Sequence, residues 1–275
     1  KKHKIPNYLY VQDLWPENVE IVTGIHSPFI LKPIGKMVDY IYKNCDQIFA
    51  TSPSFVKEIC KRGAEAEKVH YWPQYAEEFY KPLERKPTVE IPDEECFKII
   101  FTGNIGYAQG LEVLPKAAEI LKNENEKVKF YIVGDGRYKS ELLKEIKQRK
   151  VDDMFKMIDR QPAERIPELL AACDAAFISF KDEPLFYKTI PAKLQSYMAC
   201  GMPVIASAQG ETERIINESD CGICSEIGDV EELSKGIRRM MRKVPTQMGE
   251  NGRKYFGKKF DKQILMDQME KYFRG

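Results

Sequence analysis

Hydrophobic and polar positions in the first third of the chain alternate in a pattern that predicts short strands separated by helices. In the first helical stretch, Ile34, Met37 and Ile41 recur at the spacing of one helical face. Ser52 and Pro53 are residue types expected at the start of a second helix. The predicted elements are strands at 8–11, 45–51 and 69–72 and helices at 33–44 and 53–62. This β-α-β-α-β order is typical of a parallel sheet with crossover helices.

A proline-rich, charged segment between Tyr80 and Phe97 interrupts the pattern and is interpreted as an interdomain linker. A second α/β block follows it. Strands are predicted at 97–102, 128–133, 154–158, 175–179 and 204–206, with a further short apolar run at 222–224. Helices are predicted at 111–123, 138–150, 163–173, 191–200, from 230 onward, and at 262–272. The chain is therefore predicted to be an α/β protein with two units, each built on a parallel sheet.

The stretch 190–206 is predicted to form a helix, a tight turn and a buried strand, with Gly201 ending the helix in a left-handed conformation. The apolar face of the helix consists of Leu194, Tyr197 and Met198. Polar residues stand at its start: Lys193, Gln195 and Ser196. A helix N-terminus with a nearby lysine can bind phosphate, whereas an ordinary helix with a solvated polar edge would carry the same residues. Both interpretations stand at this point.

Composition narrows the function classes. The chain has 275 residues, a formal net charge of +1 and 43% hydrophobic residues, so nothing in its bulk charge favours nucleic acid. No apolar run approaches the length of a membrane span, and no leader pattern opens the chain. Seven scattered cysteines fit reduced thiols in the cytoplasm. The pair Cys221 and Cys224 has no second pair of ligands, so no zinc site is expected.

Glycine-bearing turns follow three predicted strands of the second block, at 102–110, 133–137 and 200–201. Glycines allow the backbone to approach a phosphate, and helix-start N–H groups can donate to it. The first turn does not have the spacing of a dinucleotide fingerprint, and the third is interpreted as structural. In the second turn Asp135 would repel a phosphate and Arg137 would attract one. Because these turns share one edge of the sheet, together they predict a nucleotide cleft.

Two further loops follow strands at the same edge. Arg160 and Gln161 come after the strand at 154–158, where a surface loop is the alternative to a ligand contact. The polar and aromatic loop 181–188 follows the strand at 175–179, and it is interpreted either as a binding loop or as a solvated excursion.

Several motifs in sequence order resemble a known enzyme family. They are Thr102-Gly-Asn-Ile-Gly with Gln109-Gly110, Ile132-Val-Gly-Asp-Gly136, Ile166-Pro-Glu-Leu-Leu with Cys173-Asp174, and Met198-Ala-Cys-Gly-Met-Pro-Val-Ile205. Together they resemble the retaining GT-B glycosyltransferases of family four. The version Lys193-Leu-Gln-Ser-Tyr-Met-Ala-Cys-Gly201 resembles the branch that builds O-antigen, colanic acid and capsule. Gln12-Asp-Leu-Trp-Pro16 and Thr51-Ser-Pro53 resemble the later half of the acceptor domain, so the resemblance covers essentially the whole chain.

The resemblance implies a GT-B fold with two Rossmann-like domains, the first of them incomplete. Residues 1–86 would be the later part of the acceptor domain, 87–258 the donor domain and 259–275 a terminal crossover helix. A chain that starts at Lys1, close to its first strand, also leads us to expect an N-terminal truncation.

The resemblance also implies roles in donor binding. Gly103 and Asn104 would border the diphosphate with Gln109 near them, and Gly134 and Gly136 would shape the cleft. Arg160 and Gln161 would lie by the base, while Lys193, Gln195 and Ser196 would face the diphosphate, ribose or sugar. The family pattern has cations at the positions of Asn104 and Gln109, and two glutamates at those of Lys188 and Ser196. Lys188 and Lys193 are therefore expected to supply the missing positive charge; no catalytic residue is assigned.

The implied function is hexosyl transfer from a UDP-sugar to a lipid-linked glycan, with retention, in cell-surface polysaccharide biosynthesis. The departing diphosphate would be stabilised by lysines and helix N-termini. No metal or other cofactor is expected, because the sequence shows no cluster of metal ligands. The alternatives are a truncated nucleotide-sugar binding module without activity and a GT-B sugar-nucleotide epimerase, against which the Met-Ala-Cys-Gly motif argues. Peripheral contact with the inner face of the cell membrane is also expected. Basic residues near the first two helices would provide it, each with a solvated surface as alternative: Lys32, Lys36, Lys43, Lys57, Lys61 and Arg62.

Overall fold

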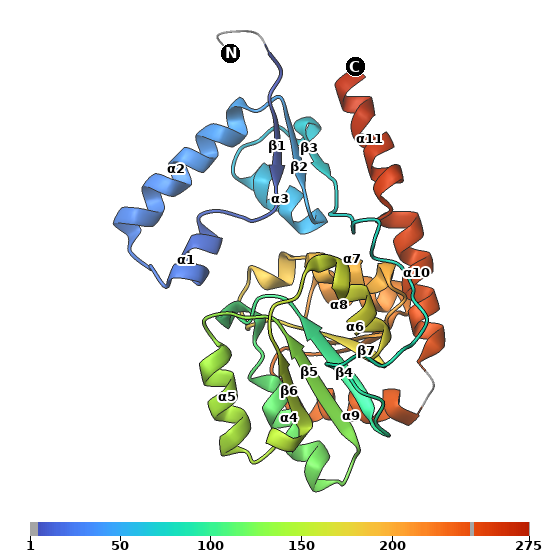
Figure 1. The fold of residues 1–275 in the computed structure, drawn as a ribbon. Helices are drawn as coiled ribbons and strands as arrows, with labels where there is room; N and C mark the ends of the chain where they lie inside the picture. The colour runs from blue at the N-terminus through green and yellow to red at the C-terminus, as the bar shows by residue number, and fades with distance from the viewer. Residues whose placement is uncertain (1–4, 243–244, 275) are drawn as a thin grey trace.

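The computed structural model describes residues 5–242 and 245–274, which form two parallel sheets with flanking helices (Figure 1). The first sheet has the strand order β1-β2-β3. Its strands are β1 (Tyr8–Val11), β2 (Gln47–Ala50) and β3 (Val69–Tyr71). The helices of this unit are α1 (Glu17–Thr23), α2 (Pro28–Asn44), α3 (Pro53–Lys61) and the short η1 (Ala66–Lys68).

The second sheet has the strand order β6-β5-β4-β7-β8-β9, and all of its recorded strand pairs are parallel. Its strands are β4 (Phe97–Thr102), β5 (Val128–Val133), β6 (Phe155–Ile158), β7 (Ala175–Ser179), β8 (Val204–Ser207) and β9 (Gly222–Ser225). Its helices are α4 (Val113–Asn123), α5 (Lys139–Gln148), α6 (Ile166–Ala171), α7 (Ala192–Ala199), α8 (Glu211–Ser219), α9 (Val230–Arg242), α10 (Thr246–Lys259) and α11 (Lys262–Arg274). Short 3-10 turns complete it: η2 (Tyr107–Gln109), η3 (Asp152–Met154), η4 (Ala163–Arg165) and η5 (Phe186–Lys188). The predicted α/β class with parallel sheets is confirmed.

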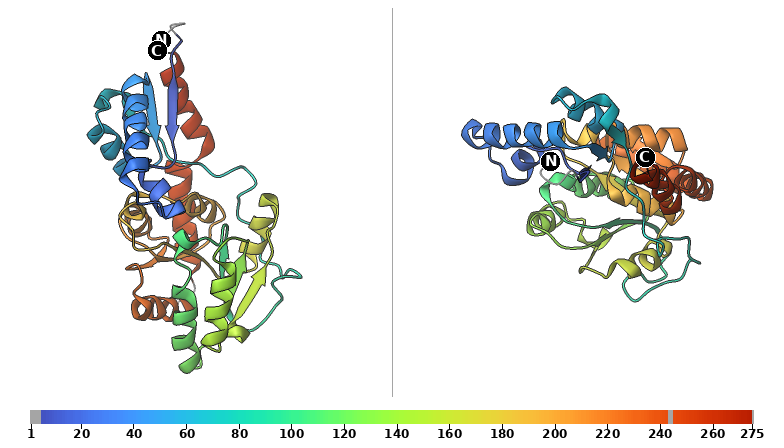
Figure 2. Two further views of the ribbon diagram at one scale, coloured as in Figure 1. Left: turned by 90° about the vertical axis from the view of Figure 1, so that its left-hand side faces the viewer. Right: turned by 90° about the horizontal axis from the view of Figure 1, so that it is seen from above.

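The second sheet separates two hydrophobic cores because alternate residues of each strand point to opposite faces. On β4, Ile99 and Phe101 enter the core beneath α4, α5 and α9, whereas Ile100 enters the core beneath α6, α7, α8 and α10. Strand β5 divides in the same way, with Phe130 on one face and Tyr131 on the other. The result is a three-layer arrangement in which helices cover both faces of the sheet (Figures 1 and 2).

The last helix leaves the second unit and packs on the first sheet (Figure 1). Trp72 Nε1, just beyond β3, donates a hydrogen bond of 2.9 Å to the carbonyl oxygen of Leu265 in α11. The rings of Phe49 and Tyr272 meet edge to face, with centroids 5.2 Å apart. The chain therefore crosses between the two units twice, once through the segment 81–96 and once through α10 and α11. The domain limits at residues 86 and 258 stay a prediction.

Three helices were not predicted from the sequence, namely α1, α8 and α10, and one begins earlier than expected. Helix α2 begins at Pro28 and continues through Pro33, where the helix was expected to begin. Pro33 has no N–H for the carbonyl oxygen of Phe29, which lies in the first turn and whose residue is 92% exposed. Water can therefore replace the missing bond. No helix among residues 5–242 and 245–274 is long and apolar enough to cross a membrane.

The two units are joined by hydrogen bonds between α8 and the N-terminus of α3. Glu211 is only 7% exposed. Its Oε1 accepts from the Ser54 N–H at 3.0 Å and from Ser54 Oγ at 2.7 Å, and its Oε2 accepts from Arg214 Nη2 at 2.9 Å. A helix N-terminus favours a carboxylate, and Arg214 supplies a second partner. Glu211 therefore fixes the second unit against the first.

Replacing Glu211 by alanine should lower the free energy of unfolding by roughly 2 kcal/mol, because Ser54 and Arg214 would lose a buried partner. Urea unfolding followed by circular dichroism measures the change. The matched control is Glu218→Ala, which removes a more exposed carboxylate 2.7 Å from the same arginine and should cost less than about 0.5 kcal/mol. Equal losses in the two variants would contradict a stabilising role for the Glu211 contact.

Candidate functional site

Three loops meet at the carboxyl edge of β4, β5 and β6, where open α/β sheets bind ligands. The Gly103 N–H donates to the carbonyl oxygen of Val133, and the Gly134 N–H donates to that of Ile158, each at 2.9 Å. The Ile105 N–H donates to the carbonyl oxygen of Asp135 at 2.8 Å. The first two glycine turns predicted from the sequence are thus hydrogen-bonded to each other.

Gly134 is required by this close approach. Its φ is +141°, and a Cβ placed on it would lie 1.9 Å from the carbonyl oxygen of Gly103. A Cβ on Gly136 would likewise lie 2.3 Å from the carbonyl oxygen of Ile105. Any larger residue at either position would force the two loops apart.

A cavity of about 530 Å³ opens beside these loops. Seven of the residues predicted to bind the donor line it: Gly103, Asn104, Gly134, Arg160, Gln161, Lys193 and Ser196. They come from four chain segments, the ends of β4, β5 and β6 and the first turns of α7. The cavity therefore collects most of the sequence-predicted residues at one place.

Lys193 provides the cavity with a cation from the first turn of α7. Its Nζ lies 2.5 Å from Gln109 Oε1 and 3.9 Å from the centre of the Phe101 ring. Among residues 5–242 and 245–274 no ion pair is recorded for it. Burial lowers the pKa of Lys193 to about 7, because lost hydration disfavours the charged form and no carboxylate among the described residues compensates for it. An anion placed in the cavity would supply that compensation.

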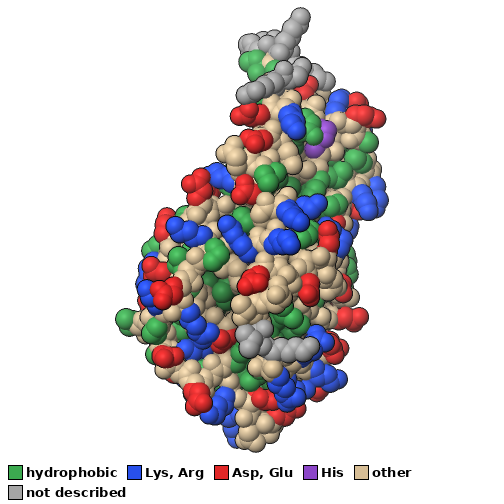
Figure 3. All heavy atoms as spheres, turned by 90° about the vertical axis from the view of Figure 1, so that its right-hand side faces the viewer, with side chains coloured by type: hydrophobic (Ala, Val, Ile, Leu, Met, Phe, Trp, Pro, Cys, Tyr) green, Lys and Arg blue, Asp and Glu red, His purple; other side chains and the backbone are tan. Residues whose placement is uncertain are grey.

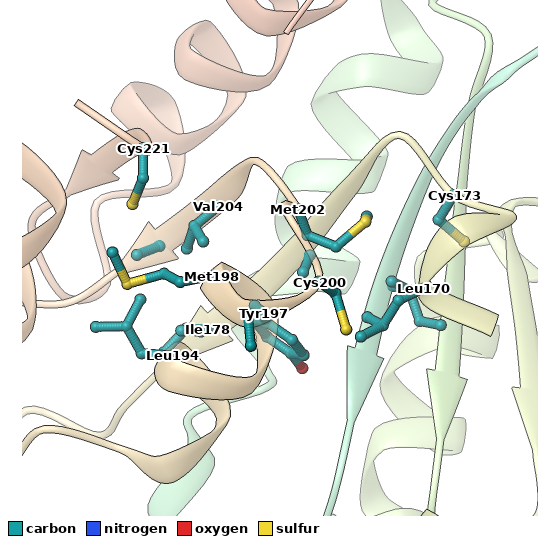
Figure 4. Close-up of a cluster of buried hydrophobic side chains, with 14 of the residues drawn as sticks. Leu170, Cys173, Ile178, Leu194, Tyr197, Met198, Cys200, Met202, Val204 and Cys221 are labelled. Atoms are coloured by element: carbon teal, nitrogen blue, oxygen red, sulfur yellow. The ribbon is translucent and has the colours of Figure 1, made fainter. Parts of the chain in front are cut away.

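Helix α7 is held to the sheet by its apolar face (Figure 4). The buried hydroxyl of Tyr197 accepts a hydrogen bond of 3.0 Å from the Thr102 N–H, at the end of β4. This contact fixes the start of α7 beside the first glycine loop. Gln195 is fully buried, and its amide nitrogen can donate to the carbonyl oxygens of Pro191 and Ala192 at 2.6 and 3.2 Å. It therefore shapes the start of the helix and does not line the cavity.

The structure places four other predicted residues outside the cavity lining. Gly136 packs behind the first loop, and Gln109 reaches the site only through Lys193. Arg137, which was expected to attract a phosphate, is also absent from the lining. Lys188 lies at the contact between the two units, with its Nζ 3.4 Å from Glu58 Oε2. The η5 turn directs Lys188 toward α3, so the expectation that it supplies charge to the cavity is not supported.

Tyr80 lines the cavity and was missed from the sequence. It comes from the start of the linker, and burial raises the pKa of its hydroxyl, while a hydrogen bond with Ser196 opposes that rise. The residues predicted to form the site follow strands or begin α7, whereas Tyr80 follows no strand of the second sheet. An aromatic residue at the start of a proline-rich linker was the only available signal.

A second cavity of about 510 Å³ lies between the two units. One wall comes from α1 and the turn after it, with Glu20 and His26 hydrogen-bonded at 2.7 Å. The other wall comes from η2 and the loop after β7, with Tyr107 and Lys181. Because the loop 103–110 borders both cavities, ligands in the two would be neighbours.

The remaining candidate features are structural. The Cys200-Gly201 turn lines a separate cavity of about 630 Å³ behind α7, beneath the linker and α10. None of the predicted donor-binding residues lines that cavity. In the described part of the chain, no group of three or more His, Cys, Asp or Glu side chains could hold a metal ion.

Comparison with known proteins finds relatives that are described as glycosyltransferases. The family model described as "Glycosyl transferases group 1" matches residues 84–255. The "Probable glycosyltransferase WbjE" of Pseudomonas aeruginosa is 27% identical over 225 residues, which are 78% of this chain and 54% of that protein. The "Putative colanic acid biosynthesis glycosyl transferase WcaI" of Escherichia coli (strain K12) is 28% identical over 242 residues, 84% of this chain and 58% of that protein. The chain therefore spans little more than half the length of these relatives.

Solved structures share the fold over both units. Anabaena Alr3699/HepE, solved in complex with UDP, matches 98% of this chain and 72% of its own, with a TM-score of 0.79 and 17% identity. WaaG, described as a glycosyltransferase involved in lipopolysaccharide biosynthesis, matches 92% of this chain and 72% of its own, with a TM-score of 0.69 and 16% identity. The predicted GT-B arrangement is thereby confirmed.

Proposed function

The chain belongs to the group 1 glycosyl transferases, and we propose that its second domain binds the diphosphate of a UDP-sugar in the cavity beside Lys193. The observation that carries this proposal is the position of the Lys193 ammonium, 2.5 Å from Gln109 Oε1. Gln109 stands where the family pattern has a cation. In this chain Lys193 of α7 therefore provides a cation close to that position. It has no carboxylate partner among the described residues.

The surrounding backbone supports the same ligand. Gly103 and Gly134 leave room for a close approach, and the first turn of α7 directs its positive end toward the cavity. Asp135 also lines the cavity, but Lys139 lies 3.8 Å from its carboxylate and offsets its charge. Lys193 and the helix N-terminus would stabilise the departing diphosphate during transfer. Arg160 and Gln161 would lie on the side of the base.

The acceptor is proposed to be a lipid-linked glycan that receives the sugar with retention. The cavity between the two units would seat it, since hydroxyl groups of a glycan can donate to Glu20 and accept from Lys181. The relative named for colanic acid biosynthesis, and a UDP complex among the structural neighbours, support this class of reaction. A lipid-linked acceptor would place the enzyme at the inner face of the cell membrane.

Calorimetric titration of the chain with UDP, UDP-glucose and uridine tests the donor site. We expect one site that binds UDP at least tenfold more tightly than uridine, because two charge-assisted hydrogen bonds depend on the diphosphate. A folded chain that binds uridine as tightly as UDP, or that binds neither, would contradict the proposal. The anomeric configuration of a product formed on lipid-linked oligosaccharides, read by NMR, would then test retention.

A further inference from the structure

The cavity of about 630 Å³ behind α7 lies across the second sheet from the donor cavity. It is lined by Cys173 and Asp174, which precede β7, and by Met202 and Pro203, which precede β8. Because these strands are parallel, the residues that precede them lie at the amino edge of the sheet, whereas the donor cavity lies at the carboxyl edge. The two cavities share no lining residue and are therefore separate sites.

The walls of this cavity are mainly apolar. Leu83 of the linker and Pro167 and Ala171 of α6 contribute to them. Cys173 and Cys200 also line the cavity and belong to the cluster of buried side chains in Figure 4. Burial raises the pKa of both thiols, so they carry no charge at neutral pH. A mainly apolar cavity of this size fits the body of a small organic molecule.

Arg253 of α10 brings a positive charge to the cavity. Its Nη1 donates a hydrogen bond of 3.0 Å to the carbonyl oxygen of Ala199, and its guanidinium lies 5.1 Å from the centre of the Phe256 ring. Among residues 5–242 and 245–274 no ion pair is recorded for Arg253. A guanidinium has five N–H donors, so several remain for an anionic group.

The charges of the other lining residues cancel. Arg85 forms an ion pair with Asp174. Glu250 and Lys254 are both exposed on α10, and their charges have opposite signs. Basic and acidic side chains are also interspersed over the face formed by α10 and α11, seen in Figure 3. A preference for an anion would therefore come from Arg253 and not from the general charge of this surface.

Three chain segments line both cavities, namely the start of the linker, α6 and α7 with its C-terminal cap. The residues, with the one in the donor cavity named first, are Tyr80 and Pro82, Ile166 and Pro167, and Lys193 and Cys200. Helix α7 has 8 residues and is about 12 Å long. Because packed interiors transmit displacement, an occupant beside Cys200 would act on α7 and hence on Lys193.

Helix α10 is attached to the same end of α7. Arg253 is hydrogen-bonded to Ala199, the last residue of α7. A Cβ on Gly249 would lie 2.1 Å from the carbonyl oxygen of Gly201, so the two helices have no space to move closer there. An anion bound to Arg253 would therefore act on α7 directly.

We propose that the cavity behind α7 binds a small organic anion with an apolar body, and that its occupant changes the affinity of the donor cavity for UDP through α7. The apolar walls would hold the body, and Arg253 would bind the anionic group. Coupling between two sites is reciprocal, so UDP must change the affinity for the anion by the same factor. Only the coupling rests on the proposed function, since the anion site is separate from the donor cavity.

Fluorescence titration with anilinonaphthalene sulfonate, a dye with an apolar body and one anionic group, tests the binding. Arg253→Gln should weaken dye binding roughly tenfold, because a charge-assisted hydrogen bond is lost. The matched control Lys258→Gln removes an exposed cation of the same helix outside the lining, and should bind within about twofold of the parent. Ala171→Phe, which fills the cavity and keeps Arg253, should also weaken binding roughly tenfold. Circular dichroism verifies that each variant is folded.

Titration of the dye at increasing UDP concentrations separates coupling from competition. We expect the apparent Kd of the dye to shift by at least about fivefold and then reach a plateau, with the same factor in the Kd of UDP at saturating dye. A dye that occupied the donor cavity would instead give an apparent Kd that rises without limit. That result, the absence of any shift, or equal dye binding by Arg253→Gln and Lys258→Gln would overturn the proposal.

The same titrations distinguish failure of this proposal from failure of the donor site. If the chain bound UDP but Arg253→Gln bound the dye like the parent, the anion site would be wrong and the donor site would stand. If the dye bound through Arg253 but UDP did not bind, the donor site and the coupling would be wrong, and the anion site would be supported.

Discussion

Replacing Lys193 by alanine should weaken UDP binding roughly 10- to 100-fold, the cost of losing a charge-assisted hydrogen bond to a phosphate. Thermal stability should change little, because the ammonium is desolvated and has no carboxylate partner among the described residues. Calorimetric titration with UDP measures the first quantity, and thermal unfolding followed by circular dichroism measures the second. If the variant bound UDP as tightly as the parent, the proposal that the diphosphate binds in this cavity would be wrong.

The depressed pKa of Lys193 adds a pH dependence with a defined sign. In the free protein this amine loses its proton as pH rises through about 7. A bound diphosphate favours the ammonium and raises its pKa, so binding takes up a proton above that pH. UDP affinity should therefore be higher below pH 7, where the amine of the free protein is protonated, and fall toward pH 9, by up to the factor that the alanine variant shows. The dependence on pH should disappear in Lys193→Ala.

Lys188→Ala tests a residue for which the structure differs from the sequence-based prediction. Lys188 and Lys193 were both predicted to supply charge to the diphosphate, but Lys188 points to Glu58 of α3. We expect UDP affinity within about twofold of the parent, because this partly exposed ion pair lies outside the cavity and such pairs contribute at most about 1 kcal/mol. If Lys188→Ala weakened UDP binding as much as Lys193→Ala, the prediction that both lysines supply charge to the diphosphate would be supported instead.

Replacing Gly134 by alanine should lower the free energy of unfolding by at least about 3 kcal/mol and eliminate measurable UDP binding. The added Cβ would lie 1.9 Å from the Gly103 carbonyl oxygen, at a φ of +141° that side chains rarely adopt. The loops must then separate, and their mutual hydrogen bonds break. For a chain of this size the loss corresponds to a fall in Tm of roughly 6–12 °C.

Gly228→Ala is the matched control for backbone strain alone. Gly228 has a φ of +80°, and a Cβ there would meet nothing within 4 Å. It should cost about 1 kcal/mol, with UDP binding unchanged. If the two variants unfold at the same temperature, the close approach of the glycine loops would not be the cause of the instability at Gly134.

Strands with mostly apolar sequences could be predicted from the sequence. The strands at 8–11, 97–102, 128–133 and 175–179 have the predicted bounds. Helix α10 could not be predicted, because Gly249 and Gly252 lower helix propensity. A Cβ on Gly249 would lie 2.1 Å from the carbonyl oxygen of Gly201, so this helix packs where only glycine fits. The glycines that lower the helix propensity of α10 also allow its close packing.

The sequence by itself determined which loops form the candidate site. Residues that follow parallel strands are brought to one sheet edge by topology, so the loops that carry Gly103, Gly134 and Arg160 were placed together from strand order. Their assignment to donor binding came from the family resemblance. The direction of individual side chains was decided only by tertiary structure. Lys193 faces the cavity because Tyr197 fixes α7 to β4, and Lys188 leaves it because η5 turns toward α3. A side chain's direction depends on contacts between distant segments, and these contacts have no signature in local spacing.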